Sequence, residues 1–172
     1  AYKKIRGQGE SFLFESVEGG MHVGRYSFVG CNPRAVIKQT ASRIEILESG
    51  KVVEKFAIPA PGKEPCENCV RDGLEVIERV MKRYKAVTVP GLPRFTGGLV
   101  GAFGYDCVRY VEPRLDRFVR ALEKKQGEKP DPIGAPDVVL LQSEEVAIVD
   151  NLAGKLFLVV YVDPRNPHSY DY

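Results

Sequence analysis

The stretch Phe12-Leu-Phe-Glu-Ser-Val-Glu-Gly-Gly-Met-His-Val-Gly-Arg-Tyr-Ser-Phe-Val-Gly30 gives the first indication of the fold. Two short apolar runs, Phe12–Glu15 and Arg25–Val29, flank a loop that contains three glycines. Such runs are typical of strands, and a glycine-rich connection between them predicts a β-hairpin. The loop presents backbone groups and small hydroxyls next to the predicted sheet. We therefore expect a binding edge here.

Size and charge limit what this edge can belong to. The 172 residues, 44% of them hydrophobic, suffice for one domain with its own core. The 25 Lys and Arg and 23 Asp and Glu are mixed along the chain, whereas nucleic-acid and anionic-membrane binding need a concentrated positive field. No apolar run reaches the roughly 20 residues of a membrane span, and no secretory signal is recognisable. We expect a cytoplasmic protein that binds neither nucleic acid nor membrane.

Further predicted β-strands follow on both sides of a central helical region. The first group predicts an antiparallel meander, with Ser49-Gly50 as a hairpin turn because glycine readily adopts the positive φ of a tight turn. The last run is apolar on both faces, which indicates part of a larger fold. The predicted strands of the two groups are Ala35–Thr40, Ile44–Leu47 and Val52–Phe56, then Val138–Leu141, Glu145–Val149 and Lys155–Val162.

After Asn68 the spacing of apolar residues changes to the three-and-four pattern of a helix. Asn68 is the expected N-cap of this main helix. Pairs of Glu and a basic residue four positions apart support its exposed side. A short turn beginning at Asp106 and a second amphipathic helix are expected later. The apolar positions on which these predictions rest are Val70, Leu74, Ile77, Met81 and Tyr84, then Leu115, Phe118, Val119 and Leu122. The fold class is α+β, mostly antiparallel sheet that forms part of a β-sandwich.

Two motifs could carry chemistry. Cys66-Glu-Asn-Cys69 fits incidental thiols or a local structural disulfide best, since a redox pair lacks its βαβ context and a zinc site lacks a second ligand pair; both other interpretations stay open. Glycines 98, 101 and 104 do not have the spacing of a nucleotide-binding loop and predict close backbone approach in a sheet. His22 and His168 lie in no catalytic context, so we expect no catalytic residue and no metal site.

Several separated motifs together resemble the N-terminal domain of anthranilate synthase component I. The resemblance covers residues 1–172 in the right order. Its motifs are Phe12-Leu-Phe-Glu-Ser-Val-Glu-Gly-Gly20, Gly24-Arg-Tyr-Ser-Phe-Val-Gly30 with Asn32-Pro33, Phe95-Thr-Gly-Gly-Leu-Val-Gly101, Gly104-Tyr-Asp-Cys-Val-Arg-Tyr-Val-Glu-Pro113 and Ala135-Pro-Asp-Val138.

The resemblance implies a part in tryptophan biosynthesis. Enzymes of this family convert chorismate to anthranilate with a magnesium ion and with ammonia delivered by a glutamine amidotransferase partner, component II. Their C-terminal chorismate-binding domain carries the catalytic histidine and the metal ligands, and it completes the tryptophan pocket. That domain lies beyond this sequence, so the chain alone is expected to be inactive and to need no cofactor.

The resemblance also implies a site for tryptophan as feedback inhibitor. Glu15 and Ser16 occupy the family's leucine-glutamate-serine motif, in which Phe14 replaces the leucine. Such a pair suits an amino acid, because a carboxylate accepts from an ammonium and a hydroxyl donates to a carboxylate. Further candidate pocket or scaffold residues are Arg25, Tyr26, Ser27, Gly97, Gly98, Tyr105 and Asp106.

Two alternatives remain open. The large subunit of para-aminobenzoate synthase shares the glycine-rich motif, although Ser-Val-Glu-Gly-Gly followed by Gly-Arg-Tyr-Ser-Phe favours anthranilate synthase. A stand-alone amino-acid-binding module is the other. A reading frame that continues past Tyr172 would exclude it.

Overall fold

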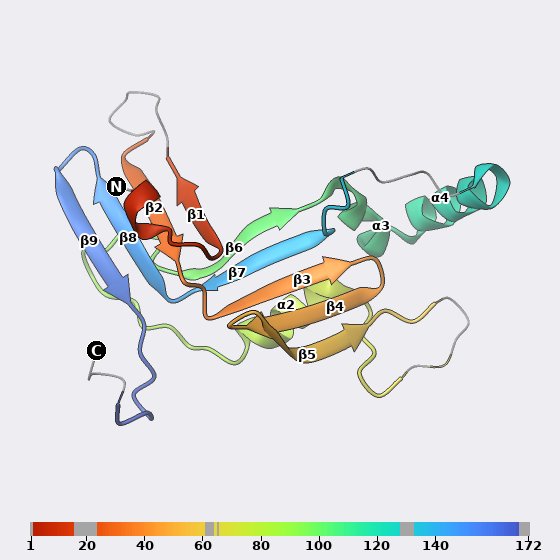
Figure 1. The fold of residues 1–172 in the computed structure, drawn as a ribbon, viewed down its shortest axis with the longest axis horizontal. Coiled ribbons are helices and arrows are strands. Elements are labelled where there is room, and N and C mark those ends of the chain that lie inside the picture. Colours follow the sequence, from red (N-terminus) through yellow and green to blue (C-terminus); the bar gives the residue numbers. More distant parts are fainter. Residues whose placement is uncertain (1, 16–23, 61–63, 65, 128–132, 169–172) are drawn as a thin grey trace. The chain divides into compact units, whose positions relative to one another are not determined.

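The computed structural model describes residues 2–15, 24–60, 64, 66–127 and 133–168 (Figure 1). Its strands form a four-stranded and a five-stranded sheet, and its helices are short, which confirms the predicted α+β class. The chain divides into two compact units. The first unit comprises Ala1–Val36, Val87–Val100 and Leu141–Tyr172, and the second comprises Ile37–Ala86 and Gly101–Leu140.

The first unit is built on the sheet with the order β1-β2-β8-β9. These strands are β1 (Ser11–Phe14), β2 (Tyr26–Cys31), β8 (Glu145–Asp150) and β9 (Lys155–Val160), and a short helix α1 (Tyr2–Ile5) precedes them. The predicted pairing of the first two strands is confirmed, because β1 and β2 are antiparallel with Phe14 opposite Phe28. Ile148 at the centre of β8 is fully buried.

One face of this sheet is covered and the other is partly open. Phe12, Phe14, Phe28 and Ile148 share the more covered face, as the register of the strands requires, although Phe14 at the end of β1 is half-exposed. On β9 the opposite face carries Leu156, Leu158 and Val160, which are 61%, 74% and 62% exposed. The sequence predicts that this strand is covered on both sides, but in this structure one side of β9 is an exposed apolar strip.

The second unit contains most of the sheet with the order β5-β4-β3-β7-β6. Its core is aliphatic, with Ile37 and Ile44 almost completely buried. The predicted turn is confirmed, since Ser49 and Gly50 have φ angles of 49° and 74° between the antiparallel strands β4 and β5. The five strands are β3 (Ala35–Thr40), β4 (Arg43–Glu48), β5 (Lys51–Ala57), β6 (Gly98–Phe103) and β7 (Val138–Ser143).

The main helix α2 (Gly73–Met81) begins later than the sequence predicts. Asn68 is not its N-cap, because its carbonyl accepts a hydrogen bond from Ala57 N–H and Val70 N–H donates to Ala57 O. These bonds hold residues 68–70 against the end of β5. The N-cap is Asp72, whose carboxylate accepts from Glu75 N–H at 2.9 Å.

The predicted buried face of α2 is wrong as well. Val76 and Val80 are buried, whereas Leu74, Met81 and Tyr84 are exposed. Gly73, Val76 and Val80 recur every three or four residues and form the buried side of the helix, whereas Leu74 and Met81 belong to a second apolar stripe of the same period that is exposed. The expected ion pairs Glu75–Arg79 and Glu78–Lys82 are present on the exposed side.

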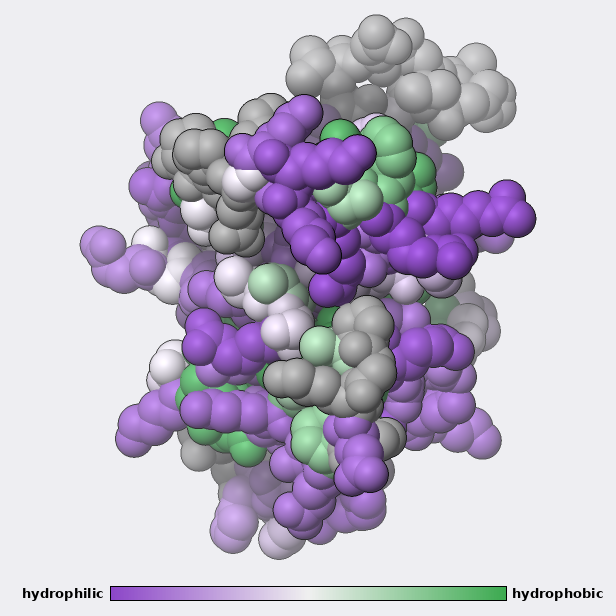
Figure 2. Space-filling model, turned by 90° about the vertical axis from the view of Figure 1, so that its right-hand side faces the viewer, coloured by the Kyte–Doolittle hydropathy of each residue, from purple (hydrophilic) through white to green (hydrophobic). Residues whose placement is uncertain are grey.

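Three short helical elements follow β6: the 3-10 turn η1 (Tyr105–Cys107), α3 (Val108–Val111) and α4 (Pro113–Gln126). Asp106 does not cap this region, because the N-cap of η1 is Gly104. The expected amphipathic helix is present as α4, but it buries no residue. Hydrophilic side chains cover most of the face in Figure 2, which looks from the side on which α4 is drawn in Figure 1.

Candidate functional site

The end of β1 carries the candidate effector residues. Glu15 directly follows the strand and is exposed, and Ser16 lies outside the described residues. Phe14, the preceding residue, is 50% exposed. Its ring centroid lies 5.3 Å from that of Phe12. This end of the sheet therefore offers a solvent-accessible carboxylate beside an aromatic surface.

Residues distant in the sequence form that aromatic surface. Phe95 packs edge-on against Phe12 and Phe28, with centroid distances of 6.4 Å and 5.4 Å. Tyr26 continues the cluster at 6.1 Å from Phe28. Edge-to-face packing suits the charge distribution of aromatic rings and adds to their hydrophobic burial. The cluster thus lies on the face of the sheet that carries Phe14, the residue before Glu15.

Arg25 is engaged by the protein itself. Its Nε and Nη2 donate to the two carboxylate oxygens of Asp150 at 3.0 Å and 2.7 Å. The guanidinium also lies over the Tyr26 ring, 4.9 Å from the centroid. Asp150 is only 2% exposed and accepts two further hydrogen bonds from Leu152 and Ala153 N–H. Arg25 therefore orders the start of β2.

Ser27 has a similar supporting position. It is buried, and Asn151 Nδ2 donates to its hydroxyl at 3.2 Å. Asn151 N–H also donates to the Arg25 carbonyl at 2.8 Å. The Gly24-Arg-Tyr-Ser27 segment is therefore tied to the turn between β8 and β9. The side chains of Arg25 and Ser27 are held by contacts within the protein, whereas Glu15 is exposed.

The Asp150 carboxylate makes the stability of this unit sensitive to acid. The hydrogen bonds from Arg25 lower the pKa of Asp150 from the ordinary 3.8 to about 2. A carboxylate with a lowered pKa in the folded state stabilises the fold above its unfolded pKa, and this stabilisation is lost as the pH falls toward 2. Asp150→Asn should therefore reduce the slope of stability against pH between about 4 and 2. Urea unfolding at a series of pH values measures the slope, and a slope equal to that of the wild type would contradict this assignment.

The glycines of the Phe95-Thr-Gly-Gly98 motif are packed closely in the same unit. Gly97 has a φ of +149°, and a Cβ placed there would lie 2.9 Å from both the Ser143 carbonyl and the Tyr161 ring. Thr96 Oγ1 and Tyr161 Oη are hydrogen-bonded at 2.6 Å. Gly98 has a φ of +124° but an open surrounding. Gly97 therefore allows close packing of this segment against Ser143 and Tyr161, as part of the scaffold.

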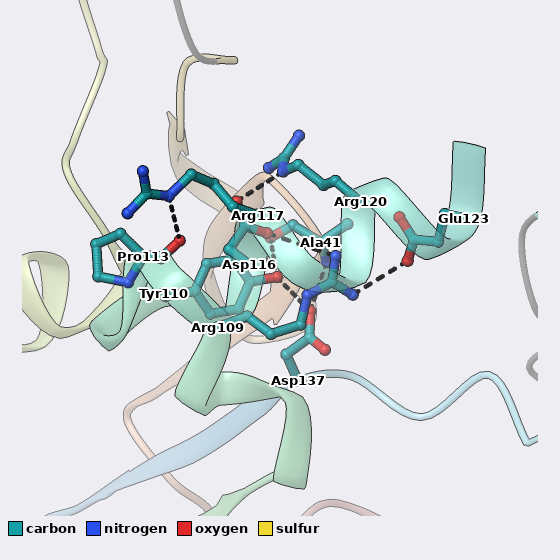
Figure 3. A network of polar contacts seen from close by, with 9 residues as sticks. All are labelled: Ala41, Arg109, Tyr110, Pro113, Asp116, Arg117, Arg120, Glu123 and Asp137. Carbon is teal, nitrogen blue, oxygen red and sulfur yellow. Dashed lines mark hydrogen bonds and ion pairs between the residues drawn. The ribbon is translucent and has the colours of Figure 1, made fainter. Parts of the chain in front are cut away.

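The remaining candidates belong to the second unit. Tyr105 is 92% exposed, and Asp106 is exposed within η1. The polar centre of that unit is instead Asp137, which accepts from Ala41 N–H at 2.7 Å and from Tyr110 Oη at 3.0 Å (Figure 3). Burial, with a contribution from Asp137, raises the pKa of Tyr110 to about 12. The Ala-Pro-Asp motif thus has a structural role.

A second set of contacts in Figure 3 joins α3 to α4. Arg109 pairs with Asp116 at 3.5 Å and with Glu123 at 3.4 Å. These two acids are seven residues apart on α4, so they lie on the same face of the helix. Arg120 pairs with Asp116 as well. The network fixes α4 against α3 through ion pairs, since α4 buries no apolar residue.

Sequence reasoning missed Asp150, Asn151 and Asp137. The signal for the first two was present, because Asp-Asn directly after an apolar strand is typical of an Asx turn. Asp137 precedes a strand, and nothing local indicates that Ala41 and Tyr110 meet there.

The described residues contain no group of three His, Cys, Asp or Glu side chains arranged to hold a metal ion. Within the same ranges no helix is long and apolar enough to cross a membrane.

The chain is similar to several known proteins over nearly its whole length. No protein-family model matches the chain. "Anthranilate synthase component 1" of Pseudomonas putida is 42% identical over 170 residues, which are 99% of this chain and 30% of that protein. The Pseudomonas aeruginosa protein of the same name is 41% identical over the same shares. The chain is therefore similar over nearly its whole length to a part of anthranilate synthase component 1 from these organisms.

The homology to anthranilate synthase component 1 extends beyond pseudomonads. The protein of that name from Neisseria meningitidis is 38% identical over 172 residues, covering 99% of this chain and 31% of its own length. The chain therefore spans about a third of the length of these relatives. The crystal structure of anthranilate synthase component I from Streptococcus pneumoniae TIGR4 has a TM-score of 0.48 and 22% identity, covering 93% of this chain and 28% of that one.

Proposed function

We propose that the chain is the regulatory and scaffold part of an anthranilate synthase component 1 that converts chorismate and ammonia or glutamine to anthranilate. The observation that carries this proposal is homology over 99% of the chain to proteins of that name. The name component 1 implies a separate component 2, for which we propose a glutamine amidotransferase. A magnesium requirement and a cytoplasmic location belong to the same proposal.

Within this assignment, the end of β1 forms one wall of the tryptophan feedback site. Glu15 supplies a carboxylate for the ammonium of the amino acid, and Ser16 supplies a hydroxyl for its carboxylate. The half-exposed Phe14 and the aromatic cluster behind it offer a surface for an indole ring. The contacts of Arg25 with Asp150 support this role of Glu15, because they fix the neighbouring strand β2.

The chemistry is proposed to reside in a part of the parent protein outside these 172 residues. The chain spans 30% of the length of its Pseudomonas putida relative. The strip Leu156, Leu158 and Val160 on β9 supports this proposal, because apolar side chains exposed in a row are typical of a surface that another segment covers. The chain alone is accordingly expected to have no synthase activity.

The proposed synthase activity is tested by an assay of the full-length parent protein. Incubated with chorismate, ammonia and magnesium, the parent should form anthranilate, which fluorescence and chromatography against an authentic standard detect. The chain alone, at the same concentration, is the control and should form none. An aminated chorismate product with the amino group in the para position would contradict the assignment and favour para-aminobenzoate synthesis.

A further inference from the structure

The Cys66-Glu-Asn-Cys69 motif forms a disulfide in the second unit. It closes a single turn, in which Cys69 N–H also donates to the Cys66 carbonyl at 3.0 Å. Neither the proposed synthase reaction nor the proposed effector site uses these sulfurs. The local disulfide expected among the alternatives is therefore present, and its chemistry can be considered separately.

This turn holds the chain against the end of β5 just before α2. Ala57 N–H donates to the Asn68 carbonyl at 3.1 Å, and Val70 N–H donates to the Ala57 carbonyl at 3.0 Å. Cys69 forms an isolated parallel bridge with Ala57. Val70 is buried at 3% exposure. The disulfide thus covalently closes the turn that leads from β5 into the capped start of α2.

The two sulfurs differ in their surroundings. Cys66 is exposed and Cys69 is half-buried, so an external thiolate has freer access to Cys66. Cys66 N–H donates a hydrogen bond to Cys69 Sγ at 2.9 Å. A hydrogen bond to a sulfur stabilises its thiolate form, which favours Cys69 as the leaving group in thiol–disulfide exchange.

We propose that Cys66 and Cys69 form a thiol–disulfide exchange site that is reduced by a dithiol and that fastens the segment before α2 only in its oxidised form. In the first step a thiolate of the dithiol bonds to Cys66 Sγ, the bond between Cys66 and Cys69 breaks, and Cys69 leaves as a thiolate. The second thiolate of the dithiol then attacks the dithiol sulfur of the mixed disulfide. This step closes the dithiol into its own disulfide and releases Cys66 as a thiolate. Two electrons and two protons pass from the dithiol to the protein.

The remaining described cysteines provide an internal reference. Cys31 and Cys107 are free thiols, and burial raises the pKa of each. A raised pKa reduces the thiolate fraction, so both react slowly with alkylating reagents. Neither takes part in a disulfide whose state depends on the reductant. A redox response confined to residues 66 and 69 can therefore be separated from general thiol chemistry.

The test uses the full-length protein that carries this chain, air-oxidised and then equilibrated in dithiothreitol buffers of increasing reducing strength. Differential alkylation and mass spectrometry should show Cys66 and Cys69 becoming reactive together, whereas Cys31 and Cys107 are unaffected by the buffer. Amide hydrogen exchange at Ala57, Cys69 and Val70 should become at least about tenfold faster on reduction.

The double variant Cys66→Ser/Cys69→Ser should show the fast exchange with and without dithiothreitol, while Cys31→Ser should keep the wild-type response. Full alkylation of Cys66 and Cys69 before any reductant is added would overturn the proposal. Equal exchange at Ala57, Cys69 and Val70 in the oxidised and reduced protein would overturn it as well. Neither result depends on anthranilate synthesis, so the outcome is separable from the proposed function.

Discussion

Replacing Gly101 with alanine should destabilise the chain by about 3 kcal/mol, a large fraction of the free energy of unfolding of a small protein. Gly101 lies in β6, where a Cβ would overlap the carbonyl oxygen of Val139 in the neighbouring strand β7. The obstacle is backbone, which cannot rotate away as a side chain can. Either β6 and β7 separate locally or both strands distort. Urea unfolding followed by circular dichroism measures the change.

Gly9→Ala is the matched control, because a Cβ at Gly9 meets nothing within 4 Å. It should change the free energy of unfolding by less than about 0.5 kcal/mol. Equal stabilities of the Gly101 and Gly9 variants would show that the two strands are not as close as the structure has them. The close-approach interpretation of Gly101 would then lose its physical basis. The same interpretation holds for Gly104, where a Cβ would lie 3.2 Å from the Asp137 carbonyl oxygen, but it is wrong for Gly98, where a Cβ meets nothing within 4 Å.

Ser16→Leu in the full-length parent should raise the tryptophan concentration for half-inhibition by about tenfold or more, within the usual range of allosteric coupling. The substitution removes the hydroxyl proposed to donate to the tryptophan carboxylate and adds an apolar side chain in its place. Turnover in the absence of tryptophan should stay unchanged, because the reacting atoms are proposed to lie outside this chain. Initial rates of anthranilate formation against tryptophan concentration measure both quantities.

Ser42→Leu is the control for this second prediction. Ser42 is an exposed residue between β3 and β4 in the other compact unit. The Ser42→Leu substitution changes side-chain size and polarity in the same way as Ser16→Leu, and it should leave the inhibition curve unchanged. Inhibition of the Ser16 variant at wild-type tryptophan concentrations would show that Ser16 is not an effector residue. A parallel loss of turnover in that variant would instead indicate a wider structural defect.

The sequence patterns predicted the strands well because the strands are short, rich in β-branched or aromatic residues, and mostly bounded by glycine, proline or a turn pair. Ala35–Thr40 has the predicted bounds, and Ser49-Gly50 forms the predicted turn. The start of α2 could not be predicted in the same way. Asn68 and Asp72 are both acceptable N-caps, and the choice depends on the pairing of residues 68–70 with Ala57, a contact over eleven or more positions.

The candidate site was predicted in part. The Glu15 end of β1 follows from the local pattern and the family resemblance together. The supporting contacts do not, because Arg25 and Asp150 are 125 positions apart and Phe95 reaches Phe12 and Phe28 from another segment. Local patterns carry no information on such pairings. For Arg25 and Ser27, which the sequence predicts as pocket or scaffold residues, the structure shows side-chain contacts with Asp150 and Asn151.

The most direct test of the central claim is calorimetric titration of the full-length parent with tryptophan. We expect one binding site per chain, with affinity lost in Glu15→Ala and in Ser16→Leu, and weak or no binding by the 172-residue chain alone. Circular dichroism of each variant confirms that the fold is retained. Tryptophan binding by both variants with wild-type affinity would contradict the account, and so would tight binding by the isolated chain.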